Sequence, residues 1–168
     1  YYFNISEDKE LTFTPSINYG GGVDNSQRFL FDYNQLTSGG NFNFDLSVDT
    51  NLENQNNNKW ISEASLITNY DNKINENFRI EIASAIETSK YYIQSTNPYD
   101  EISYNSSLSN IVNLHGYNLK KFDDKLLINA STYQVTQQNE DNKTIPTVLP
   151  FIDYYTGESN YNNYKYYS

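Results

Sequence analysis

The feature that most constrains this chain is a strict period-two alternation of apolar and polar residues. In the clearest case Phe42, Phe44, Leu46 and Val48 alternate with Asn41, Asn43, Asp45, Ser47 and Asp49. Successive side chains of a strand point to opposite faces, so this pattern predicts a strand with one apolar and one polar face. Such a strand is typical of a soluble sandwich, and equally of a barrel with lipid outside and water inside.

The same alternation recurs along the chain and predicts about nine strands. We expect them at residues 11–19, 28–34, 41–49, 64–70, 78–87, 108–114, 125–136 and 148–155, with a ninth beginning near Tyr161. The facing of the seventh strand is ambiguous, because Leu126, Leu127 and Ile128 are consecutive. The fold class predicted is all-β, an antiparallel up-and-down meander.

The predicted connections alternate in length. Short links are expected at residues 37–40, 71–77, 123–124 and 155–159. Longer or more polar ones are expected at 24–26, 51–58, 88–103 and 137–147. Short turns at one end and longer loops at the other are typical of an outer-membrane barrel. A soluble sandwich has no reason to place its long loops at every second position.

Composition favours the barrel over a soluble core. The hydrophobic content is only 37%, yet the chain has 17 Tyr. Tyr suits a boundary where one end of the ring is apolar and the other is wet. There is no apolar run as long as a membrane-spanning helix. With no Met and no signal peptide at Tyr1, we expect a mature or excised segment, and nine strands would be part of a larger transmembrane outer-membrane β-barrel.

Aromatic residues cluster at the predicted strand ends. Barrels place such residues in two girdles at the membrane surfaces. The candidates for these girdles are Tyr19, Tyr33, Phe42, Trp60, Tyr70 and Phe78.

Several function classes find no support in the sequence. The net charge of −10 and the lack of a basic stripe argue against nucleic-acid binding. The chain has no Cys and a single histidine, His115, so neither a metal site nor a nucleophilic triad is expected. Adjacent carboxylates such as Asp123 and Asp124, which fall in a predicted turn, are better explained by turn chemistry and solvation than as an acid–base pair. We therefore predict no enzyme activity and no cofactor.

The order of several short motifs resembles the start of the barrel in the LptD family of lipopolysaccharide-assembly proteins, also called organic solvent tolerance proteins. The aromatic opening Tyr1–Ser6 precedes Leu11-Thr12-Phe13-Thr14-Pro15, which resembles the family's "D-L-T-x-T-P" strand, although Glu10 stands before Leu11 where the family has Asp. Residues 28–33, 40–49 and 130–134 with Pro146 and Leu149-Pro150 resemble later strands in family order. The resemblance covers most of residues 1–168, but each motif is short.

The resemblance implies a function and a location. Family members form a large barrel in the cell outer membrane and release lipopolysaccharide into the outer leaflet through a lateral seam between the first and last strands. It also implies partners: lipopolysaccharide, outer-membrane lipids, an LptE-like lipoprotein plug in the lumen and the periplasmic Lpt bridge. On this reading, residues 1–168 hold the first barrel strands, without the jelly-roll domain or the closing strands.

Candidate site residues follow from these readings. Pro15 lies inside an alternating strand but has no N–H for a ladder, so it marks either a weakened lateral seam or an ordinary edge or strand-end proline. Polar residues on the strands would face the lumen and could line a path for sugar and phosphate groups or contact the plug. Alternatively, they reflect only a water-filled interior. They are Asp45, Asp49, Arg79, Glu81 and Glu87.

Two other classes of protein stay open from the sequence. One is another outer-membrane barrel, such as a porin or a TonB-dependent receptor. The other is a soluble secreted β-module that binds carbohydrate through surface Tyr and Asn.

Overall fold

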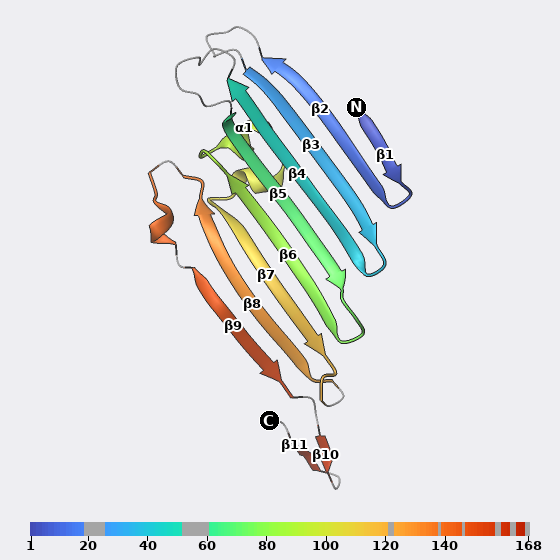
Figure 1. Cartoon of the computed structure of the whole chain (residues 1–168). Coiled ribbons are helices and arrows are strands. Elements are labelled where there is room, and N and C mark those ends of the chain that lie inside the picture. Colours follow the sequence, from blue (N-terminus) through green and yellow to red (C-terminus); the bar gives the residue numbers. More distant parts are fainter. Residues whose placement is uncertain are drawn as a thin grey trace.

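The computed structural model describes residues 1–18, 26–51, 61–120, 123–137, 139–145, 147–156, 159–161 and 164–166. Among the described residues, no helix is both long and apolar enough to cross a membrane. Across these described ranges, nine strands lie side by side in sequence order in one open antiparallel sheet (Figure 1). The strands are β1 (Tyr2–Ser6), β2 (Lys9–Asn18), β3 (Ser26–Thr37), β4 (Gly40–Asn51), β5 (Ile61–Lys73), β6 (Phe78–Glu87), β7 (Ser107–Tyr117), β8 (Lys125–Val135) and β9 (Val148–Tyr155).

The all-β, up-and-down antiparallel meander predicted from the alternation is confirmed. The strands differ from the prediction at the two ends of the sheet. A short strand, β1, precedes the predicted first strand and pairs with β2. The expected ninth strand near Tyr161 is wrong as a member of the sheet, because β10 (Ser159–Tyr161) and β11 (Tyr164–Tyr166) pair only with each other.

The connections alternate in length along the sheet. The ends of β1–β2, β3–β4, β5–β6 and β7–β8 are joined by residues 7–8, 38–39, 74–77 and 118–124, at what we call the turn end. At the opposite end, the loop end, the longer connections begin and end: 7 residues separate β2 from β3, 9 separate β4 from β5, 19 separate β6 from β7 and 12 separate β8 from β9. In Figure 1 the turns step downward from β1 to β8, so the strands are staggered along the sheet.

A close approach of backbone explains the glycine pair at the β3–β4 turn. Gly40 opens β4 opposite Asn72, and a Cβ there would overlap the carbonyl of Asp71. Only a residue without a side chain lets β5 pass so near.

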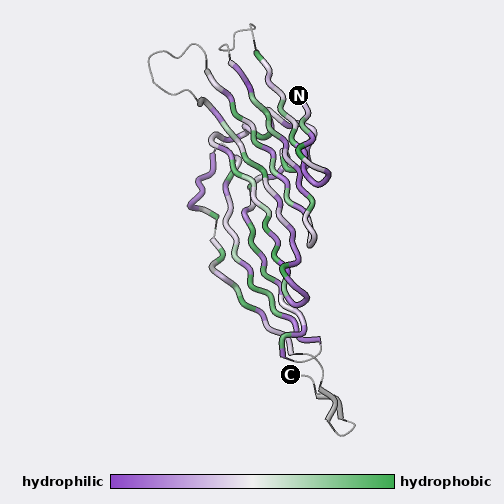
Figure 2. The backbone as a smooth tube through the Cα atoms, turned by 45° about the vertical axis from the view of Figure 1, so that its right-hand side comes forward, coloured by the Kyte–Doolittle hydropathy of each residue, from purple (hydrophilic) through white to green (hydrophobic). Residues whose placement is uncertain are grey.

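The register sorts nearly every strand residue onto one of two faces, and the hydropathy colours alternate along the strands in Figure 2. Directly paired residues share a face, so the pairs Phe31–Leu46, Leu46–Leu66 and Leu66–Ile86 belong to one continuous apolar face. The ambiguity at residues 126–128 is resolved. Ile128 pairs with Leu114 and Ile152 on the apolar face, whereas Leu127 pairs with His115 on the other, polar face.

One insertion covers part of the polar face. The β6–β7 connection contains a short helix, α1 (Tyr92–Thr96), and a 3-10 turn, η1 (Glu101–Tyr104), and the β8–β9 connection contains η2 (Asn142–Thr144). Ile93 of α1 packs with Ala85, Leu108 and Ile67 in the small core of the protein. None of this was predicted, since the connection was expected only as a long loop.

Candidate functional site

Burial in this sheet is inverted relative to a soluble protein. Among the described strand residues, nearly all the buried ones lie on the polar face. They are Ser47, Asp49, Ser65, Ala85, Glu87, Ser131 and Val135, and the two exceptions are Leu108 and Gly116. On the apolar face of the central strands, Ile86 of β6 is 45% exposed and Val112 of β7 is 43% exposed. The chain exposes 11989 Å² in total, whereas a compact monomer of 19.5 kDa is expected to expose about 8,500 Å².

The apolar face ends in a row of aromatic residues near the turn end. The ring centroid of Phe42 lies 6.0 Å from that of Tyr33 and 6.1 Å from that of Tyr70. The Tyr33 hydroxyl donates to Gln35 Oε1 at 3.0 Å, and the Tyr70 hydroxyl accepts from Asn72 Nδ2 at 2.8 Å. Both partners lie closer to the turns, so each ring is apolar on the sheet side and polar toward the turn end.

Two further residues extend this aromatic row. Phe78, the first residue of β6, lies on the same face at the turn end. Tyr154 of β9, which the sequence reading did not single out, donates its hydroxyl to Asp124 Oδ2 in the β7–β8 turn at 2.7 Å. Tyr19 and Trp60, proposed for the girdles, lie outside the described residues.

Pro15 lies on β2 where no described residue pairs with the strand on the β1 side. The backbone N–H of Phe13 donates to the carbonyl of Tyr1 on the β1 side. Residues two apart on a strand direct their backbone groups to the same side, so the ring nitrogen of Pro15 faces that side too, beyond the end of β1. On its other side β2 pairs with β3 along its full length, with Pro15 opposite Phe29. The missing donor therefore leaves no gap in the described ladder.

The five polar candidates share the polar face, but their surroundings differ. Asp49 and Glu87 are buried beneath α1. Asp45 lies opposite Asp32, half-buried beside α1. Arg79 and Glu81 lie near the turn end, away from the insertion.

At the loop end an ion pair fixes α1 to the sheet. Arg28 binds Asp49 in a bidentate pair, with Nε to Oδ1 at 2.7 Å and Nη2 to Oδ2 at 2.8 Å. The guanidinium also lies over the Tyr92 ring, 5.9 Å from its centroid, within cation–π range. The Tyr92 hydroxyl is hydrogen-bonded to Ser47 Oγ at 2.8 Å. Burial raises the pKa of Tyr92 to about 12, so the phenol is neutral at physiological pH.

Glu87 also attaches α1 to the sheet, through a hydrogen bond to its backbone. The pairing of β6 with β7 stops at Ser84–Asn110, and the strands separate beyond it. The Gln134 side chain takes the place of the missing ladder: its Oε1 accepts from Glu87 N at 3.0 Å and its Nε2 donates to Glu87 O at 2.6 Å. The Glu87 carboxylate then accepts from the backbone N–H of Ile93 at 2.9 Å.

A second charged network lies at the turn end of the polar face. Arg79 binds Asp71 through Nε at 2.7 Å and Nη2 at 2.5 Å, and its Nε lies 3.3 Å from Glu81 Oε1. His115 Nε2 lies 3.1 Å from Glu81 Oε2, and its ring stacks on Tyr117. This network is solvent-exposed, so each pair contributes little to stability.

Sequence reasoning missed Arg28, Ser47, Tyr92 and Gln134 as parts of the site. A signal existed only for Arg28, which lies opposite Asp49 once the two strands are paired as a hairpin. The contacts of Tyr92 and Gln134 join residues more than forty positions apart and follow no local pattern.

The fold and its faces define a class: an open antiparallel meander with an exposed apolar face, a partly covered polar face, and turns and loops segregated to opposite ends. No family model, no curated protein and no solved structure matches this chain. No group of three or more potential metal ligands occurs within the part of the chain that the structure describes.

Proposed function

We propose that this chain forms part of the wall of a transmembrane β-barrel in the cell outer membrane, with the apolar face toward lipid and the polar face toward an aqueous lumen. The inverted burial carries the proposal. Strands β3 to β8 lie about 4.8 Å apart and are about 37 Å long at about 3.4 Å per residue, so their apolar face covers about 1,000 Å². The largest patch on a typical soluble monomer is roughly 300–600 Å².

The strand dimensions support the same assignment. Strands β3 to β8 contain 10 to 13 residues. At about 3.4 Å per residue and a tilt of about 45°, eleven residues rise about 26 Å, close to the apolar band of such barrels. The stagger of the turns is what tilted barrel strands require.

The aromatic row fits one membrane surface. Tyr33, Tyr70 and Tyr154 each direct the hydroxyl to a polar partner near the turns, which is how amphipathic rings anchor at a headgroup layer. In this proposal the turn end faces the periplasm and the loop end faces the exterior.

The edges of the sheet require partners in this setting. Within the described residues, β1 pairs only with β2 and β9 only with β8. Backbone groups left unpaired in hydrocarbon are costly, so the wall closes only when further strands cover both edges.

Within this class, the activity we propose is lipopolysaccharide export into the outer leaflet through a lateral seam. It rests on the ordered motifs that resemble the LptD family. Pro15 supports it, because this residue offers no backbone N–H to any segment that pairs with β2 next to Tyr1. The proposed partners are lipopolysaccharide, outer-membrane lipids, a lumen lipoprotein and the periplasmic bridge. A solute channel is the second candidate, favoured by the α1 insertion that narrows the space above the polar face.

Site-directed spin labelling tests the membrane assignment. The chain has no Cys, so Leu46→Cys and Asp45→Cys each give one labelling site on adjacent residues of opposite faces. In liposomes, the label at residue 46 should collide with dissolved oxygen in the lipid, and the label at 45 with a water-soluble nickel complex. If both labels report the same environment, the wall assignment is refuted in favour of a sandwich or a soluble module.

Depletion in the native cell tests export separately. We expect newly made lipopolysaccharide to stop reaching the cell surface when this protein is depleted. Normal delivery, together with ion conductance of the protein in planar bilayers, would refute export and leave the channel, while the spin-label result would still stand.

A further inference from the structure

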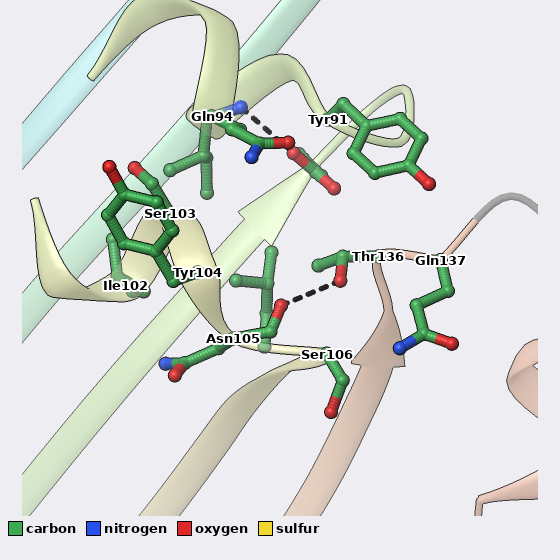
Figure 3. A pocket seen from close by; sticks show the side chains of 12 residues that line it. Tyr91, Gln94, Ile102, Ser103, Tyr104, Asn105, Ser106, Thr136 and Gln137 are labelled. Carbon is green, nitrogen blue, oxygen red and sulfur yellow. Dashed lines mark hydrogen bonds between the residues drawn. The ribbon is translucent and has the colours of Figure 1, made fainter. Parts of the chain in front are cut away.

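A pocket of about 230 Å³ lies at the loop end, where the β6–β7 connection meets the start of the β8–β9 connection (Figure 3). Hydrogen bonds between the two connections fix its walls. Thr136 Oγ1 donates to the carbonyl of Asn105 at 2.7 Å, and Lys90 Nζ donates to the carbonyl of Gln137 at 2.6 Å. The pocket therefore belongs to both loops and exists only when they are docked together.

The inner wall contains a buried carboxylate that is only half satisfied. Glu87 lines the pocket and is 6% exposed. Its Oε2 accepts from Ile93 N, whereas Oε1 is buried with no hydrogen-bond partner among the described residues. A buried polar oxygen without a donor is costly and uncommon, so this atom indicates a missing donor.

The rest of the lining is neutral and rich in hydrogen-bonding groups. Gln94, Asn105 and Gln137 supply amides and Ser106 a hydroxyl. The hydroxyls of Ser103 and Thr136 already donate to the carbonyls of Asn97 and Asn105, so toward a ligand they act as acceptors. Two aromatic rings also line it, Tyr91 at 41% exposed and Tyr104 at 72%, and the aliphatic side chains of Ile93, Ile102 and Leu108 complete the lining. Tyr91 is held at a left-handed φ of 67°, a strained conformation for a residue with a side chain.

We propose that this pocket binds one neutral sugar unit, which donates a hydroxyl to Glu87 Oε1 and packs a C–H face on the more exposed ring, that of Tyr104. A hydroxyl supplies the donor that the carboxylate lacks, and the amides satisfy the remaining hydroxyls. The volume equals that of about eight waters at about 30 Å³ each, enough for a single sugar ring. Among the described lining residues Glu87 is the one carboxylate and none is basic, so the pocket disfavours anionic sugars.

Sugar binding in this pocket requires neither the proposed export activity nor a membrane. The pocket residues lie at or beyond the strand ends at the loop end, and a soluble module with the same loops would have the same pocket.

Saturation-transfer NMR on the full chain, in a detergent without a sugar headgroup, tests the proposal. The probes are glucose, galactose and N-acetylglucosamine, with N-acetylneuraminic acid as the anionic comparison. We expect at least one neutral sugar to bind with a Kd of about 1 mM and the anionic sugar to bind more weakly. Binding of none of the neutral sugars, or tighter binding of the anionic one, would overturn the proposal.

Three variants locate the contact. Glu87→Gln keeps the shape and an acceptor for Ile93 N but replaces the carboxylate, so the affinity should fall roughly ten- to hundredfold. Tyr104→Ala should also weaken binding, without altering the buried carboxylate. Tyr99→Ala is the matched control: Tyr99 is 97% exposed on the same connection and outside the lining. Equal affinity in all three variants and the parent chain would place the sugar elsewhere and refute the site.

Discussion

A charge placed on the apolar face should destabilise the protein far more than the same charge one residue away. Leu46 lies on β4 six residues after Gly40, about 20 Å along the strand. At a tilt of about 45° this is about 14 Å of height, near the middle of an apolar band about 25 Å tall. Arginine at that depth on a lipid-facing position costs about 2–4 kcal/mol. Leu46→Arg should therefore lower the free energy of unfolding in lipid vesicles by about that amount.

Asp45→Arg is the matched comparison. Asp45 lies on the polar face opposite Asp32, so an arginine at position 45 would attract Asp32, whereas the native aspartate repels it. We expect a change within about 1 kcal/mol, the range of surface charge pairs. Urea unfolding from liposomes, followed by circular dichroism, measures both variants. The face assignment fails if Leu46→Arg costs no more than Asp45→Arg.

The remaining predictions concern the attachment of α1. Arg28→Ala leaves the buried Asp49 without its bidentate partner and should lower the free energy of unfolding by about 3–5 kcal/mol. Arg79→Ala, in the exposed network, should lower it by under about 1 kcal/mol. Equal losses for the two variants in chemical denaturation would contradict this. The pKa of Tyr92 is raised from 10.0 to about 12, so its stabilising effect is complete below pH 10 and lost as the pH rises through about 12. The difference between ultraviolet titrations of the parent chain and Tyr92→Phe should show one phenol ionising near 12, and a midpoint near 10 would mean that Tyr92 is not buried.

The sequence predicted the central strands well because their signal is local. In β4, side chains on one face are all apolar and those on the other all polar from Asn41 to Asp49, and no other periodicity fits. Strand β1 was missed because it is five residues long and joins β2 through Glu7 and Asp8, without the Gly or Asn that marks a tight hairpin. Near Tyr161, the local strand preference was real, but the partner was the next few residues rather than the sheet.

The candidate site was less predictable because it depends on pairing between distant segments. The polar residues were assigned to one face from parity alone, and the register places them there. Parity does not reveal which of them an insertion covers, and α1 folds back over Asp49 and Glu87 through contacts with Ser47 and Arg28. The unsatisfied Glu87 oxygen is a consequence of that docking.

Charge on the polar face bears on what could pass along it. Acidic residues there outnumber basic ones: Glu10, Asp32, Asp45, Asp49, Glu63, Asp71, Glu81, Glu87 and Asp153 against Arg28, Lys73, Arg79 and Lys125. A face of one sign concentrates the opposite charge and repels its own. The phosphates of lipopolysaccharide would therefore be repelled from this wall unless cations or a basic surface lay against it. If the export proposal is right, the lumen lipoprotein should present basic side chains toward β3 to β6. A channel with the same wall would need no such partner and would favour cations over anions.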